Sequence, residues 1–242
     1  MMMTALRLAA VLAFVTPARA AAPQADEILS RSDEVRNPQL DYTLNARVES
    51  FKPDAEPERG LFEVMVKGRD RTVIKTFEPS SSRGRTLLMR GHDMWVFLPD
   101  AAQAVRITLQ MRLMGSVSNG DLARANFSGD YTPKILREED GCWVLDLTAK
   151  SDDLTYHHIV YWVEKGSYRP RKAQFFALSD HLLKDCTYED YRELGGRERP
   201  SKIVIHDAIV KDRHTTISYG GIRVDALTEK LFTKDYLKKL KY

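Results

Sequence analysis

The pattern of hydrophobic positions changes from a helical period to a period of two near residue 40. Between Pro23 and Asn37, apolar side chains gather on one side of a helical projection and charged side chains occupy the others, which predicts an amphipathic helix. Pro38 ends it, because the residue before a proline is disfavoured in the helical region. Residues 40–49 then alternate between apolar and polar positions, as in a strand with one buried face.

Most of the remaining chain reads as short strands separated by turns. Residues 109–127 break the alternation and are cut by glycines, which predicts short helical turns lying over or inside the sheet, and a short helix is expected over 227–240. With no repeat and no linker, residues 21–242 are expected to form a single domain. The other expected strands are 61–67, 71–77, 86–89, 94–98, 105–107, 142–148, 156–164, 171–178, 182–191, 203–210 and 215–219.

Residues 1–20 have the organisation of a cleaved secretory signal peptide. Arg7 precedes an uncharged apolar run over residues 8–15, and Ala18 and Ala20 supply the small residues of a cleavage site. The run is too short to anchor the chain in a bilayer, and no cysteine follows the cleavage position to carry a lipid. We therefore expect a soluble periplasmic protein, with a buried N-terminal helix as the less favoured interpretation.

Charge and cysteine usage narrow the functional classes further. The formal charge of +3 falls to +1 when the two arginines of the signal are removed, so nothing favours a nucleic-acid partner. Cys142 and Cys186 lie on predicted strands three steps apart, roughly 14 Å at the usual strand spacing. A disulfide needs Cα atoms within about 7 Å, so two free, buried thiols are expected.

The chain shows no recognisable catalytic or metal-binding motif. Neighbouring side chains on a strand point to opposite faces, so His157 and His158 would not chelate one ion together. We expect no metal, no cofactor and no enzymatic activity, and a lipid-ester hydrolase is the least supported alternative. The histidines are His92, His157, His158, His181, His206 and His214.

Several predicted strands carry large apolar side chains on both faces, notably residues 61–66, 94–98 and 203–205. One face needs a core, and the other then needs a second cover or a cavity. All methionines after the first three residues fall between Met65 and Met114. Methionine suits sites that accept variable apolar shapes but equally fills gaps in a core, so a binding site and a core stay equally supported.

Four segments carry a family resemblance: GRTLLM at 84–89, MWVFLP at 94–99, VRI at 105–107 and MGSVSNGDLARANFSGDY at 114–131. They resemble the signature of the LolA-like outer membrane lipoprotein-sorting proteins, and the matches continue to LFTKDYL at 231–237. The resemblance implies a mainly β (α+β) fold, an unclosed antiparallel β-barrel or half-barrel whose concave side is covered by short helices, as in LolA and LolB.

The resemblance also implies a function. Such proteins carry the acyl chains of lipoproteins or lipids from an inner-membrane transporter, here of ABC or RND type, towards an outer-membrane acceptor. A monomer with an apolar cavity is expected. The alternative is a periplasmic sensor or adaptor of the same fold that binds a membrane-protein partner and regulates an envelope process.

Candidate site residues follow from the apolar pattern and from the resemblance. Arg69 falls near the arginine that latches the lid in the lipoprotein carriers, with a plain turn arginine as the alternative. Asn119, Gly120 and Asp121 are expected in a tight turn or helix cap rather than as direct ligands. A one-residue error in register would exchange the two faces of a strand. The expected cavity and lid residues are Met65, Met89, Trp95, Phe97, Leu109, Leu113, Met114, Val117 and Phe127.

Overall fold

The computed structural model describes residues 23–38, 40–99, 101, 103–123 and 126–238. The expected signal peptide, residues 1–20, lies outside the described residues. Within the described ranges, no helix is long and apolar enough to span a bilayer.

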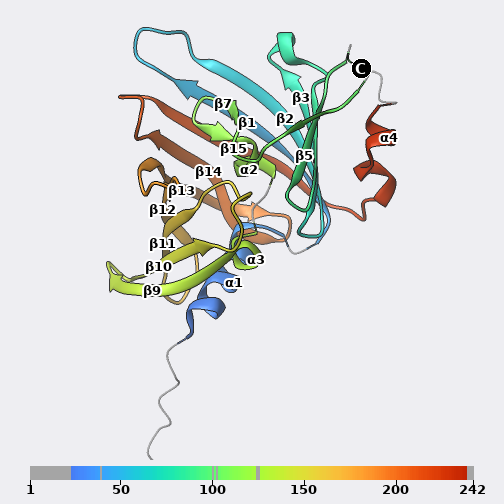
Figure 1. Ribbon diagram of the computed structural model, residues 1–242. Helices are drawn as coiled ribbons and strands as arrows, with labels where there is room; N and C mark the ends of the chain where they lie inside the picture. The colour runs from blue at the N-terminus through green and yellow to red at the C-terminus, as the bar shows by residue number, and fades with distance from the viewer. Residues whose placement is uncertain (1–22, 39, 100, 102, 124–125, 239–242) are drawn as a thin grey trace, which may run out of the picture.

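An antiparallel sheet of thirteen strands forms most of the described chain (Figure 1). Its order is β6-β5-β4-β3-β2-β1-β15-β14-β13-β12-β11-β10-β9. Strands that are adjacent in this sheet are also consecutive in the sequence, except for β1 and β15, which pair although they are far apart in the chain. The end strands β6 and β9 do not pair with each other, and the expected unclosed half-barrel is confirmed. The strands are β1 (Tyr42–Phe51), β2 (Glu58–Lys67), β3 (Arg71–Glu78), β4 (Thr86–Arg90), β5 (Asp93–Phe97), β6 (Val105–Ile107), β9 (Tyr131–Glu139), β10 (Cys142–Ala149), β11 (His158–Glu164), β12 (Pro170–Phe176), β13 (Leu182–Leu194), β14 (Arg197–Asp207) and β15 (His214–Val224).

Short elements lie on the concave side of this sheet (Figure 1). They are α1 (Ala25–Arg36), a hairpin of β7 (Arg112–Met114) and β8 (Val117–Ser118), α2 (Asn119–Ala123) and α3 (Phe127–Asp130). The helical turns expected over 109–127 are therefore only part of that segment, because it also contains the β7–β8 hairpin. Its strands are two and three residues long, too short to produce a visible alternation. A further 3-10 turn, η1 (Ser80–Ser82), connects β3 to β4.

The main core lies between the concave face and these covering elements. Alternate residues of β1 and β15 point into it, and Ala46, Val48 and Ile217 are almost completely buried. α1 packs its buried Ile28 and Leu29 into the same core, as its amphipathic pattern predicts.

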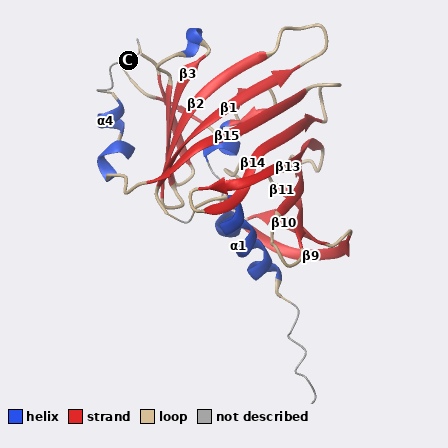
Figure 2. Ribbon diagram, turned by 180° about the vertical axis from the view of Figure 1, so that it is seen from behind, coloured by secondary structure: helices blue, strands red, loops and turns tan. Residues whose placement is uncertain are grey.

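A second, smaller core lies on the convex side of β2–β5, beneath the C-terminal segment (Figure 2). This segment consists of the 3-10 turn η2 (Glu229–Phe232) and α4 (Lys234–Leu237). The single helix expected over 227–240 is wrong for the described part, because Thr233 is extended and its Oγ1 accepts a hydrogen bond from Tyr236 N, which begins a new helix. We call this second cluster the convex core; its buried members are Met65, Val73, Leu88, Phe97, Phe232 and Leu237.

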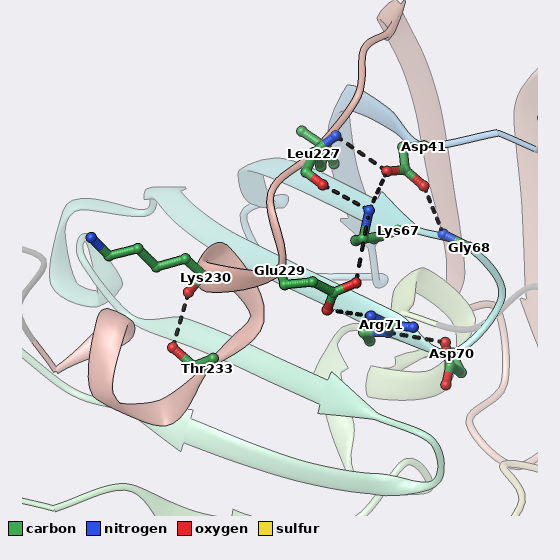
Figure 3. A network of polar contacts seen from close by, with 9 residues as sticks. All are labelled: Asp41, Lys67, Gly68, Asp70, Arg71, Leu227, Glu229, Lys230 and Thr233. Atoms are coloured by element: carbon green, nitrogen blue, oxygen red, sulfur yellow. Dashed lines mark hydrogen bonds and ion pairs between the residues drawn. The ribbon is translucent and has the colours of Figure 1, made fainter.

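A polar clasp fastens the C-terminal segment to the sheet (Figure 3). Asp41 accepts hydrogen bonds from Lys67 Nζ at 2.9 Å, Gly68 N at 3.0 Å and Leu227 N at 3.2 Å. Burial alone would raise the pKa of Asp41, but these hydrogen bonds and the charge of Lys67 hold it below its usual value. Glu229 adds ion pairs with Arg71 and Lys67.

The two cysteines are free and buried, as expected. Cys142 lies on β10 and Cys186 on β13, three strands apart in the sheet. Burial raises the pKa of the Cys186 thiol to about 12, so it is not ionised at neutral pH.

Candidate functional site

Two adjoining pockets occupy the concave side, between the long strands and the short covering elements. The first, which we call the apolar pocket, has a volume of about 780 Å³ including space open to solvent. Strands β12–β15 contribute its aliphatic and aromatic floor, and α1, α2 and α3 contribute its roof. Such a volume is typical of small-molecule sites. Its main apolar lining residues are Phe127, Tyr131, Leu154, Tyr156, Phe175, Tyr188, Ile203, Ile205, Ile217 and Tyr219.

The second pocket, which we call the cationic pocket, has a volume of about 830 Å³ including space open to solvent. It lies over β1, β2 and β3, next to the apolar pocket. Its lining includes Arg36, Arg69 and Arg199 together with Asp33 and Asp121. The two pockets adjoin, because they share lining residues; the shared residues are Arg36, Asn37, Asp121, Pro200 and Tyr219.

Asp121 holds α2 in place at the boundary between the pockets. Its side chain forms an ion pair with Lys184, and the two side chains are only 12% and 5% exposed. Ser118 N donates to Asp121 Oδ2 at 2.7 Å, and the Tyr156 hydroxyl donates to Oδ1 at 2.6 Å. Residues 119–121 open α2, so the expected helix cap is confirmed, but Asp121 also contributes a buried charge that the sequence did not reveal.

The tip of the β7–β8 hairpin is anchored to the far wall of the concavity. Gly115 has φ +53°, and an added Cβ would lie 2.4 Å from Ser50 Oγ, so only glycine fits this close approach. Next to it, Ser116 Oγ donates to Asp207 Oδ2 at 2.8 Å, and Lys184 Nζ donates to Ser116 O at 2.7 Å. The β7–β8 hairpin and α2 are therefore fastened by side-chain hydrogen bonds and by the ion pair between Asp121 and Lys184.

Arg36, the last residue of α1, lies in the wall that both pockets share. Its Nη2 donates to Asp33 Oδ1 at 2.8 Å, and its guanidinium carbon lies 3.6 Å from the centre of the Phe127 ring. Burial raises the pKa of Asp33 above its usual value, against the opposing effects of Arg36 and of the hydrogen bond from Ser128 N. Burial would lower the pKa of Arg36, but Asp33 and neighbouring tyrosines raise it, so the guanidinium stays charged.

Arg199 is a second buried arginine of the cationic pocket. Its Nη1 donates to the carbonyl oxygens of Glu34 at 2.7 Å and Val35 at 3.1 Å, and its Nε donates to Leu194 O at 3.0 Å. It therefore fastens the C-terminal turn of α1 to β14. Burial, with the nearby charge of Arg197, lowers the pKa of Arg199.

The structure separates the expected site residues into two groups. Phe127 lines the apolar pocket and Arg69 lines the cationic pocket, at the β2–β3 turn. Met89, Leu109, Leu113, Met114 and Val117 belong to the concave core but line neither of these pockets. Met65, Trp95 and Phe97 lie on the other face of their strands, in or against the convex core. The role of all these residues in holding a cargo stays a prediction.

The residues that line most of the apolar pocket were missed because they come from strands far apart in sequence. Ile203 and Ile205 carry a usable signal, since residues 203–205 are apolar on both faces. Phe175 and Ile217 have the ordinary alternation of any half-buried strand, which does not distinguish a pocket from a core. None of the five methionines after residue 3 lines either of these pockets, so the methionine clustering does not mark this space.

Comparison with known proteins decides the family. The crystal structure of a LolA superfamily protein from Nitrosomonas europaea is 38% identical to this chain, and the match covers 89% of this chain and 100% of the other with a TM-score of 0.85. The chain belongs to the LolA superfamily. A family model described only as an uncharacterized protein matches residues 68–239 of this LolA superfamily member. A search of curated proteins found no match.

Two more distant structures share the LolA fold. A DUF1329 family protein from Desulfovibrio piger is 22% identical, with coverage of 88% of this chain and 97% of the other. A putative outer membrane lipoprotein-sorting protein domain from Vibrio parahaemolyticus is 21% identical, with coverage of 89% and 98%. Both superpose with a TM-score of 0.75, and at these identities the likeness establishes the fold alone.

Within the described residues, no group of three or more His, Cys, Asp or Glu side chains is placed to hold a metal ion. The two pockets offer a broad apolar surface together with tyrosine hydroxyls and two buried guanidinium groups. Such a site is suited to binding an amphiphilic molecule.

Proposed function

We propose that this LolA superfamily protein is a periplasmic carrier that binds the acyl chains of a lipoprotein or lipid on its concave side. It would receive this cargo from an inner-membrane transporter of ABC or RND type and pass it towards the outer membrane. Residues 21–242 would act as one binding domain after removal of residues 1–20. The protein would work as a monomer without a cofactor.

The apolar pocket is the observation that supports this proposal most directly. Its floor is built from side chains of four neighbouring strands, including Ile203, Ile205 and Ile217, and Phe127 closes it from above. Each methylene transferred from water into such surroundings contributes about 0.8 kcal/mol. An acyl chain can therefore be held without directed polar contacts, and a cover fastened by hydrogen bonds can open to release it.

The first experiment is native mass spectrometry of the protein purified from its own periplasm, followed by organic extraction and lipid analysis. A near-stoichiometric lipid or acylated peptide would support the carrier function and identify the class of cargo. A protein that stays empty and instead copurifies with a membrane-protein partner would favour the sensor or adaptor alternative.

A matched pair of variants tests the position of the cargo. Ile203 faces the apolar pocket, whereas Val204 faces the opposite side of β14. Ile203→Trp fills the pocket without adding charge and should weaken binding of the uncharged fluorophore N-phenyl-1-naphthylamine by about tenfold or more. Val204→Trp should leave binding unchanged. Equal binding by both variants would contradict this pocket as the cargo site.

A further inference from the structure

The two halves of the concave space differ in charge. The two pockets adjoin at Arg36, which lines both, but the arginines Arg36, Arg69 and Arg199 all line the cationic half. The acidic residues there are Asp33 and Asp121. Asp121 is already paired with Lys184, so its charge is matched by a cation outside the arginine group.

The ion pair with Asp33 does not satisfy every N–H donor of Arg36. The salt bridge uses Nη2 of the guanidinium, while Nε of Arg36 is buried without any hydrogen-bond acceptor. A buried polar group without a partner is uncommon and is destabilising. In addition, Asp33 shares its carboxylate with Ser128 N, which donates to Oδ2 at 2.7 Å.

Arg199 has carbonyl oxygens rather than a carboxylate as its hydrogen-bond acceptors. The carbonyl oxygens at the end of a helix supply a partial negative charge of about one half, which leaves part of the guanidinium charge unbalanced. The Arg199 side chain is buried, so water screens this charge weakly. The wall of the cationic pocket therefore carries an excess of positive charge.

We propose that the cargo has an oxyanion head group, a carboxylate or a phosphate, which lies in the cationic pocket near Arg36 while its hydrocarbon chain occupies the apolar pocket. This inference rests on the proposed carrier function and narrows it to anionic amphiphiles. Guanidinium groups present planar N–H donors that match the oxygens of carboxylates and phosphates. An anionic head group would balance the excess charge and could give the unpartnered edge of Arg36 an acceptor after a small shift of the side chain.

The test compares displacement of N-phenyl-1-naphthylamine by dodecanoate, monododecyl phosphate and dodecanol at neutral pH and fixed salt. The chains have the same length and differ in the head group alone. A hydrogen bond to a charged group contributes about 1.5–3 kcal/mol, so at least one of the anions should displace the fluorophore at a concentration roughly tenfold or more below that of dodecanol. The better of the two anions distinguishes a carboxylate from a phosphate head group.

Variants test whether the preference for an anionic head group comes from Arg36 and its surroundings. The readout is the displacement of the fluorophore by the anion relative to its displacement by dodecanol. Asp33→Asn removes the competing carboxylate and should raise the preference for the anion severalfold. The double variant Asp33→Asn/Arg36→Gln removes both charges together, leaves no lone buried ion, and should lower the preference below that of the wild type. The control Arg106→Gln removes an exposed charge on β6, away from both pockets, and should leave the ratio unchanged.

The outcomes separate this inference from the proposed function. If dodecanol and both anions displace the fluorophore equally well, the anionic head group is wrong while the carrier function stands. If the fluorophore does not bind to the wild type at all, the proposed function fails, and this inference fails with it. If Arg106→Gln lowers the ratio as much as the double variant does, the preference comes from general surface charge and not from the cationic pocket.

Discussion

Strands β2–β5 are apolar on both faces, but the two faces are covered in different ways. On the convex face, Phe232 and Leu237 of the C-terminal segment enter the convex core directly and are almost fully buried. On the concave face, the cover also buries apolar side chains such as Val117 and Leu122. It is fastened in addition by buried polar contacts, such as Ser116 with Asp207 and Asp121 with Lys184. The apolar pocket and the cationic pocket both lie on this concave side.

This difference shows what each kind of anchor does to the space beneath it. An apolar side chain stabilises a cover by filling volume, because dispersion contacts require close packing. A hydrogen bond fixes a distance between two atoms and leaves the volume around them unfilled. It can also be exchanged for hydrogen bonds to water at a net change of only about 1 kcal/mol. The convex cover therefore fills the volume beneath it, whereas the concave cover combines apolar packing with polar anchors and leaves two pockets.

The largest effect is expected when a buried side chain of the C-terminal segment is removed from the convex core. Phe232→Ala should destabilise the protein by about 3–5 kcal/mol, because a buried aromatic ring is lost from the convex core. Urea denaturation measures the change, and Leu178→Ala, at a side chain that is 73% exposed, is the control and should shift stability by about 0.5 kcal/mol or less. Below the unfolding transition, binding of N-phenyl-1-naphthylamine should persist. Loss of binding in the still-folded variant would contradict the independence of the two faces.

A smaller effect is expected from loosening the concave cover. Asp121→Asn leaves the buried Lys184 without its counter-charge and should cost about 2–3 kcal/mol. The same variant should take up the fluorophore faster in stopped-flow measurements, because α2 loses its main anchor. Asp121→Asn/Lys184→Met removes both charges and should recover part of the stability while uptake stays fast. Slower uptake in both variants would contradict the role of this ion pair in holding the cover.

The smallest effects come from two carboxylates with opposite pKa shifts. The lowered pKa of Asp41 means that its contribution to stability is present above pH 3.8 and disappears as the pH falls through the lower folded value. The raised pKa of Asp33 means the reverse: its contribution is present below pH 3.8 and is lost as the pH rises through the higher folded value.

As the pH rises from 3 to 7, Asp41→Asn should therefore lose about 1 kcal/mol relative to the wild type. Over the same interval, Asp33→Asn should gain stability relative to the wild type. Chemical denaturation between pH 3 and pH 7 measures both changes. Changes of the same sign with pH for the two variants would contradict the assignment of the shifts.

The sequence predicts most of the strands because they have one buried and one solvated face. The alternation over residues 40–49 therefore reports directly on local geometry, and β1 follows it closely. The same logic fails where both faces are covered. Residues 94–98 give no indication of which face meets the concave core, and the structure places Trp95 and Phe97 against the C-terminal segment instead.

The site was harder to predict because its parts meet only through the fold. Arg36 ends a helix that precedes the sheet, and Arg199 lies on β14, yet both line one pocket. No spacing in the sequence relates two residues at such a separation. The continuous apolar pattern of residues 203–205 was the best local indication of the pocket floor, whereas the methionines lie elsewhere and line neither pocket.

The ends of the sheet have a mechanical consequence. A closed barrel has its radius set by the number of strands and their stagger, so it cannot widen without breaking hydrogen bonds. Here β6 and β9 terminate the thirteen-stranded sheet without meeting. The curvature of the sheet is therefore a soft degree of freedom, and small changes in strand twist can be summed across it without loss of any β-ladder. The two edges of the sheet can therefore move relative to each other in a way that a closed barrel does not allow.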